Sequence, residues 1–148
     1  MMKKHLNNKG YMLVEIILAS ALAMVVVYFI TELTIKLKNK NDDLLVKTLV
    51  YTDQAIIYNE IIEDLYKNRP SSPCTRYSFS KDPATGIVTF SINATGFKNV
   101  ISEYADVDIE KKECNYSASN GIFNMNIPIT VKQLPDEDFS IDIKYKLP

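Results

Sequence analysis

The sequence has little of what metal and nucleophilic chemistry needs. Its 148 residues include one histidine, two cysteines and no tryptophan. The histidine, His5, lies among the first ten residues, so a Ser/His/Asp, Cys/His or His-ligated metal site has no histidine to use in the rest of the chain. No phosphate-binding loop, dinucleotide fingerprint or paired-carboxylate constellation stands out either. We therefore predict that the protein is not an enzyme and carries no catalytic residue.

An excess of positive charge is also missing. Lysine and arginine number 17 against 18 aspartates and glutamates, which gives a formal net charge of -1. Wholesale nucleic-acid binding needs a basic domain or stripe, and the nine tyrosines are scattered without basic residues around them. The sequence therefore predicts no direct nucleic-acid site. With 47% hydrophobic and 24% charged residues, the composition is that of one small folded unit.

A long apolar run is present near the N-terminus. Tyr11 to Ile30 are twenty residues whose single charge is Glu15, and a basic leader precedes them. Twenty helical residues span about 30 Å, which is the thickness of one bilayer core. We therefore predict a membrane-inserted helix.

Two ordinary interpretations of this segment stay open. A secretory signal peptide would be cut near Ala21 or Ala23, but the apolar run continues past both alanines and contains Glu15. A plain membrane anchor fits the length. However, an acidic residue at mid-bilayer costs about 2.5 to 3.5 kcal/mol and usually serves a purpose, although Glu15 lies nearer one end, where the cost is smaller.

The order Lys9, Gly10, Tyr11, then Glu15, after a short basic leader and before a long apolar run, resembles the class III signal of type IV prepilins and pseudopilins. The resemblance implies that a prepilin peptidase cuts between Gly10 and Tyr11, that Tyr11 becomes N-methylated, and that Glu15 is the fifth residue of the mature chain. Tyrosine replaces the usual first phenylalanine. The resemblance covers about the first 40 residues, and it implies a structural filament subunit.

The physical role of Glu15 follows from its position. After cleavage, a charged amine lies four residues before this carboxylate, on the same face of the helix. In a bundle of such helices, the amine of one copy can meet Glu15 of a neighbour and set the axial register. A buried charge without a partner costs several kcal/mol, so an unregistered copy is disfavoured. The alternative is a Glu15 that extends to the lipid headgroups without a protein partner.

The resemblance also implies partners and a location. The expected partners are the prepilin peptidase, other pilin or pseudopilin subunits, an inner-membrane assembly platform, and lipid before assembly. Lysines flank the apolar run on both sides, so lysine counting does not orient the helix; the short leader and the cleavage motif place the leader inside. We expect a single-pass protein of the cytoplasmic membrane with its C-terminal domain outside, later part of an envelope or surface filament.

The chain beyond the membrane is expected to continue as helix. Apolar residues recur at three- and four-residue steps, which predicts one buried stripe. Its members are Leu44, Leu45, Leu49, Val50, Ile56, Ile57, Ile61, Ile62 and Leu65. Residues 39–43 are polar and could bend or restart the helix, and Pro70 ends it because a proline disfavours helical geometry before it. We expect four parts: a leader (1–10), a membrane helix (11–31), an outer amphipathic helix (32–69) and a β-domain (70–148).

The β-domain should consist of short antiparallel strands. The expected strands are Arg76–Ser80, Ile87–Ala94, Phe97–Tyr104, Val107–Glu110, Asn115–Ala118, Ile122–Val131 and Phe139–Lys146. Pro128 suggests an edge strand or a bulge. The predicted fold is α+β, with a long N-terminal helix packed on one four- to six-stranded antiparallel sheet, which is also the pilin architecture.

The sequence of this domain contains two smaller candidate sites. Cys74 and Cys114 can form a disulfide if the domain is outside the cell, although spacing alone also allows two reduced, buried thiols. The acidic run of Asp136, Glu137 and Asp138 could hold Ca²⁺, as C-terminal loops do in some pseudopilins, but a solvated turn is the simpler interpretation.

Together these features predict a minor pilin or pseudopilin subunit of a system for DNA uptake, secretion, adhesion or motility. The sequence does not choose among these systems. A rival interpretation is a membrane-tethered binding module that does not polymerise, and a tethered enzyme is a third. Substitution of Glu15 separates the first two, because a simple tether does not need this carboxylate.

Overall fold

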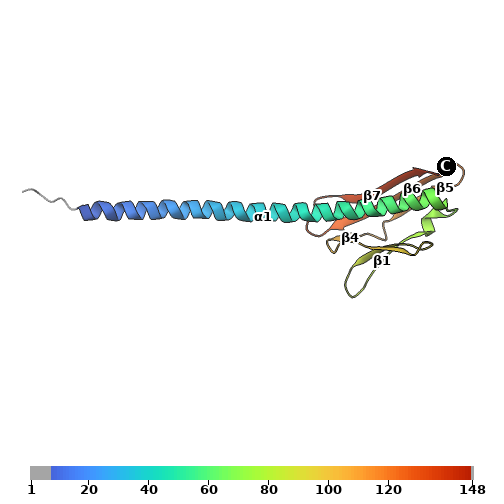
Figure 1. The fold of residues 1–148 in the computed structure, drawn as a ribbon, viewed down its shortest axis with the longest axis horizontal. Coiled ribbons are helices and arrows are strands. Elements are labelled where there is room, and N and C mark those ends of the chain that lie inside the picture. The colour runs from blue at the N-terminus through green and yellow to red at the C-terminus, as the bar shows by residue number, and fades with distance from the viewer. Residues whose placement is uncertain (1–7, 148) are drawn as a thin grey trace, which may run out of the picture. The chain divides into compact units, whose positions relative to one another are not determined.

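The computed structural model describes residues 8–147, with side chains from residue 12 onward. The chain divides into two compact units, one up to Asp42 and one from Asp43, which are described separately. Figure 1 shows the elements: one long helix, α1 (Asn8–Asn68), and short strands that follow it in the sequence. The fold is α+β, as predicted, with the helix packed on antiparallel sheets.

Helix α1 has 61 residues and runs without interruption through the polar residues 39–43. No proline or glycine occurs between Tyr11 and Arg69 to break it. The helix ends where the sequence predicts, just before Pro70. Arg69 adopts the left-handed conformation, with φ of 41°, and its N–H donates to the Leu65 carbonyl at 3.2 Å, which caps the last turn.

The outer half of α1 buries a narrower face than the sequence predicts. Val50, Ile57, Ile61 and Leu65 are fully buried, as expected, and Val46 joins them. Four predicted members of the stripe are instead exposed, with exposed fractions of 37% to 61%: Leu44, Leu45, Leu49 and Ile56. Leu45, Leu49 and Ile56 each precede a buried residue by one position, and one position turns a helix by about 100°. They therefore flank the core without entering it.

The strands form two sheets, not the single sheet that the sequence predicts. The first sheet has the order β1-β2-β3, and the second has β6 between β7 on one side and both β4 and β5 on the other. A short 3₁₀ turn (Pro73–Thr75) joins α1 to the first sheet. The strands are β1 (Tyr77–Lys81), β2 (Val88–Ile92), β3 (Phe97–Val100), β4 (Ala105–Val107), β5 (Glu113–Ser117), β6 (Ile122–Val131) and β7 (Phe139–Lys146).

Strand alternation decides which side chains enter the core. In β7, Phe139, Ile141 and Ile143 are buried while Ser140, Asp142 and Lys144 are exposed. The inner faces of both sheets and the buried face of α1 share one hydrophobic core. Aromatic rings link its layers, since the Tyr77 and Phe123 rings lie 6.0 Å apart between the two sheets. The outer helix and both sheets thus belong to one packed unit.

The expectation that Pro128 marks an edge strand or a bulge is wrong. Strand β6 is central, and its pairing with β7 keeps one unbroken register from Ile122 to Ile129. The Pro128 carbonyl accepts the Asp108 N–H at 3.1 Å, so the missing proline N–H points to the same side. On that side β5 pairs only up to Asn126 and β4 only from Ile129. The proline therefore lies between the β5 and β4 ladders, where the chain just after β4 bonds to its carbonyl and the missing N–H interrupts neither ladder.

Candidate functional site

The first half of α1 is apolar on all sides. Its large apolar side chains between Met12 and Leu37 have exposed fractions of 51% to 72%. The most apolar window of this helix has a mean hydropathy of 2.6, and none of that window is buried within the protein. Length and composition therefore make this helix able to cross a membrane. Exposure of so much apolar surface to water is unfavourable. We therefore expect lipid or other apolar helices to cover this part of α1.

Glu15 is the single acidic residue between Met12 and Thr31. It is exposed and has no hydrogen bond or ion pair with any side chain between residues 12 and 147. The next acidic residue, Glu32, differs because Lys36 Nζ donates to its Oε1 at 2.7 Å. No side chain in the described part of the protein therefore compensates the Glu15 charge when lipid or protein surrounds it.

The expected processing site is only partly described. Gly10 and Tyr11 belong to the backbone of α1, whereas most of the expected leader, including His5, lies outside the described residues. Tyr11 and Glu15 are four residues apart in one helix, and the i,i+4 relation places them on the same face one turn apart. The geometry thus permits an amine at Tyr11 and a carboxylate at Glu15 to share one helix face.

The predicted disulfide is formed. Cys74, in the 3₁₀ turn after α1, is bonded to Cys114 on β5, and their Cα atoms lie 5.7 Å apart. The bond ties the end of the helix to the four-stranded sheet. The loop that it closes contains the whole three-stranded sheet.

The acidic run of residues 136–138, a candidate Ca²⁺ site in the sequence, contacts a lysine of α1. Lys47 Nζ on α1 lies 2.5 Å from Glu137 Oε1, and this hydrogen bond raises the pKa of the lysine. Within residues 8–147, no group of three or more His, Cys, Asp or Glu side chains is arranged to hold a metal ion. Glu137 thus contributes a contact between α1 and the loop before β7.

Sequence reasoning missed a polar cluster at the end of α1. Asp64 is buried, with 4% of its surface exposed, although it carries a charge. Its two oxygens accept from Arg76 Nε at 2.6 Å and Nη2 at 2.9 Å, from Tyr77 Oη at 3.0 Å and from Asn68 Nδ2 at 2.7 Å. The signal was available, because Asp64 stands seven residues after Ile57 and three after Ile61, at a core position of the helix.

Electrostatics show how this cluster is satisfied. Burial alone would raise the pKa of the Asp64 carboxyl, but the hydrogen bonds from Arg76, Asn68 and Tyr77 outweigh it and hold this pKa below its ordinary value. Burial, with the Asp64 charge beside it, raises the pKa of the Tyr77 hydroxyl far above its usual range. The cluster stays ionised at the carboxylate and neutral at the phenol, and it fastens the helix end to β1.

Two further contacts connect α1 to the sheets on different flanks. The Asp53 carboxylate accepts the Ser102 N–H at 2.8 Å, and burial raises the pKa of this carboxyl against the opposing effect of that hydrogen bond. The Gln54 amide donates to the Ser140 carbonyl at 3.2 Å. Asp53 thus holds the chain after β3, and Gln54 holds the start of β7.

The hollows of this unit are lined by charged groups that mostly serve structural contacts. One of about 390 Å³ lies between α1 and β3, and its lining includes Glu63, Lys67 and Phe97. Three of its charged groups are engaged, since Lys67 pairs with Glu63 and Asp64 pairs with Arg76. Lys112 is half-buried, which lowers the pKa of its amine, but Nζ donates to the Tyr77 carbonyl at 2.7 Å. These groups hold structure together.

Comparisons of the chain with protein-family models, with curated proteins and with solved structures find no match.

Proposed function

We propose that the protein is a minor subunit of a type IV pilus or pseudopilus, that is, a structural filament subunit of a DNA-uptake, secretion, adhesion or motility system. One observation carries this proposal: Glu15, five residues after Gly10, pairs with no side chain between residues 12 and 147 and lies on the first half of α1, whose large apolar side chains are all exposed. A filament of such helices would cover the apolar surface and give the carboxylate a cation.

Assembly would follow from charge pairing. A prepilin peptidase would remove residues 1–10, and the new amine of Tyr11, methylated or not, would pair with Glu15 of an adjacent subunit. Two opposite charges that meet in an apolar bundle compensate one another, whereas either one alone costs several kcal/mol. The pair therefore favours one axial position of each subunit against the next. Other apolar contacts can then contribute adhesion without having to set the register.

The location in this proposal is the cytoplasmic membrane before assembly, with the outer unit outside, and the filament afterwards. The disulfide between Cys74 and Cys114 supports this orientation, because such bonds persist in oxidising compartments outside the cytoplasm. The expected partners are the peptidase, the assembly platform, lipid and other subunits. In this proposal the role is structural, with no catalytic step.

Replacement of Glu15 tests the proposal. In a host with the cognate assembly system, Glu15→Val should remain in the membrane at the normal level but should be lost from sheared filaments. Glu32→Gln is the matched control, because Glu32 lies on the same helix and already pairs with Lys36. Assembly of the Glu15→Val protein equal to that of the control would remove the filament proposal and favour a membrane-tethered binding module.

A further inference from the structure

Each sheet of the outer unit ends in a strand with one open edge. Among the described residues, β3 pairs with no strand besides β2, and β7 pairs with none besides β6. At the start of the β7 edge the Ser140 carbonyl accepts the Gln54 amide of α1 at 3.2 Å, which leaves this carbonyl one further lone pair for a neighbouring strand. The opposite edge of the first sheet is covered, because Lys112 donates to the Tyr77 carbonyl of β1 and Lys81 pairs with Asp106. Proteins usually blunt or cover edge strands, so an edge left open is a candidate for pairing with another chain.

The free backbone groups on these edges can be assigned. The Ile101 N–H donates to Val88 on β2, and alternate residues of a strand point to opposite edges, so the groups of Lys98 and Val100 face outward. After β7, the Leu147 N–H donates to the Gly121 carbonyl beside β6, so the odd-numbered residues of β7 bond toward β6. The groups of Asp142 and Lys144 therefore face outward as well.

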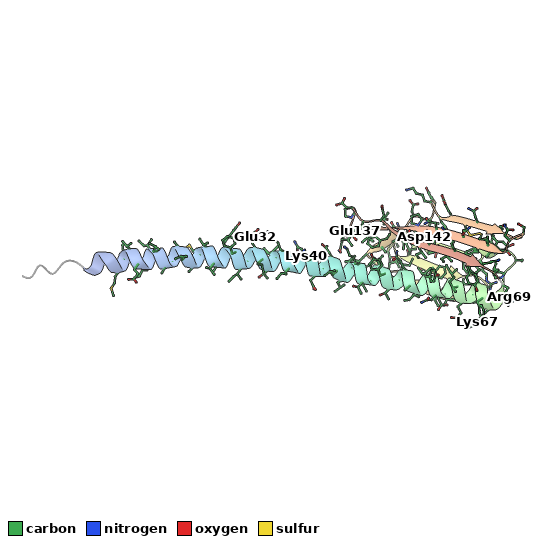
Figure 2. The ribbon with its side chains drawn as sticks, turned by 90° about the horizontal axis from the view of Figure 1, so that it is seen from above. Glu32, Lys40, Lys67, Arg69, Glu137 and Asp142 are labelled. Carbon is green, nitrogen blue, oxygen red and sulfur yellow. A yellow bond between two sulfur atoms is a disulfide. The ribbon has the colours of Figure 1, made fainter. Side chains whose placement is uncertain are left out.

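The two edges lie on different flanks of α1. Lys67 and Phe97 line the same hollow, so β3 starts on the Lys67 flank. The Phe139 ring at the start of β7 lies 5.7 Å from the Tyr51 ring. Tyr51 and Lys67 are about 160° apart at 100° per residue. Figure 2 agrees, since Asp142 of β7 and Lys67 appear on opposite sides of α1.

The two strands also run in opposite directions along the helix. Strand β3 starts beside Lys67 and leads to Ser102, which is bonded to Asp53, so it runs against α1. Strand β7 starts beside Tyr51 and runs with α1. Its last residues pair with β6 at Phe123, whose ring contacts Tyr77, and the Tyr77 hydroxyl reaches Asp64 near the helix end.

Charge supplies the last observation. Lys98 on β3 and Asp142 on β7 are both exposed, and neither has an ion-pair partner within the described part of the chain. Among residues 12–147, the side chains that donate to the Asp142 carboxylate are those of Asn126 and Ser140, which carry no charge. Because Lys98 and Asp142 lie on different flanks of one molecule, they can meet only between two molecules.

We propose that β3 of one copy pairs antiparallel with β7 of the next, with Lys98 opposite the next copy's Asp142 and the exposed Val100 opposite Ser140. This contact rests on the proposed function, because copies that share a membrane point their helices the same way, and β3 and β7 then meet antiparallel. Two different surfaces are joined, so the contact is heterologous and extends from copy to copy without closing as a two-fold dimer would.

Cysteine cross-linking of the full chain in membranes tests this pairing. Directly opposed residues of an antiparallel hydrogen-bonded pair have Cα atoms about 5.5 Å apart, which suits a disulfide. Lys98→Cys combined with Asp142→Cys should give a ladder of dimers, trimers and longer species on mild oxidation. The matched control is Lys98→Cys combined with Asn124→Cys, because Asn124 is exposed on the same face but lies on the central strand β6. A monomeric double variant, or an equal ladder from the control, would overturn the proposal.

Charge reversal gives an independent readout. With Val100→Cys and Ser140→Cys as the cross-linking pair, Lys98→Asp or Asp142→Lys alone should lower the yield by a factor of about 1.4 to 5, which corresponds to a cross-strand charge effect of roughly 0.2 to 1 kcal/mol. Both reversals in one chain should restore the yield. Failure of the double reversal to restore it would contradict the pairing of these two residues.

The two proposals fail separately. A ladder from a chain that assembles equally well with Glu15→Val would remove the pilus proposal and leave the strand contact in place. Filaments that require Glu15 but give no ladder would remove the strand contact and leave the pilus proposal.

Discussion

The disulfide between Cys74 and Cys114 should contribute a large part of the stability of the outer unit. The two residues are 40 positions apart, and the loop between them contains all of the three-stranded sheet. The chain-entropy model gives about 4 kcal/mol at 25 °C for a closed loop of this length. Typical domains have a total stability of only about 5 to 15 kcal/mol, so the loss would be severe.

The test compares the wild type with a Cys74→Ser, Cys114→Ser double variant in detergent. Chemical unfolding followed by circular dichroism should show the free energy of unfolding lowered by about 4 kcal/mol. A reductant should destabilise the wild type by a similar amount and leave the double variant unchanged, which is the control. A loss below about 1 kcal/mol would show that residual structure in the unfolded state already restrains this loop, and would refute the entropic reasoning.

Two further perturbations test the packing of α1. Ile57→Ala should lower the free energy of unfolding by about 2 to 5 kcal/mol, because Ile57 is fully buried. The neighbouring Ile56 is 37% exposed, so Ile56→Ala should lower the free energy of unfolding clearly less. Equal losses of stability in thermal unfolding would contradict the assigned core face. Asp64→Asn should destabilise at neutral pH. The extra free energy of unfolding that the wild type has over this variant is fully present above the unfolded-state pKa of about 3.9. It is lost as the pH falls through the lower pKa that the Asp64 carboxyl has in the folded state. A difference in the free energy of unfolding that does not change with pH would refute the account of Asp64.

Much of the helical architecture was predictable because its signals are local. An apolar run of twenty residues, the absence of glycine and proline up to Arg69, and Pro70 after it together predict one long helix and its end. The disulfide was predictable as a pairing because only two cysteines exist. The last two strands, β6 and β7, were predictable from alternation and have the expected bounds.

The sheet arrangement was not predictable in the same way. Alternation shows which side of a strand is buried, but it does not show which strand lies next to it. The sequence therefore predicted one sheet where the structure has two. Pro128 was misassigned because a gap between β4 and β5 depends on the tertiary pairing of β6. The stripe on α1 was drawn too wide, since apolar composition does not reveal how far the sheets reach around the helix.

The candidate site likewise has features that the sequence shows and features that only the structure shows. Glu15 and its spacing from Gly10 are visible in the sequence, and the structure adds that no side chain between residues 12 and 147 pairs with this carboxylate. Asp64 was overlooked because its partners Arg76 and Tyr77 lie beyond the end of the helix. The open edges of β3 and β7 require the topology, since neither strand alone reveals whether it is central or terminal.

The most direct test of the central claim is the mature N-terminus. The protein should be purified from membranes of a host that carries its cognate prepilin peptidase, and its intact mass and N-terminal sequence should be determined. The account predicts a chain that starts at Tyr11, with or without one added methyl group. A chain that still starts at Met1, or one that starts after Ala21 or Ala23, would contradict it.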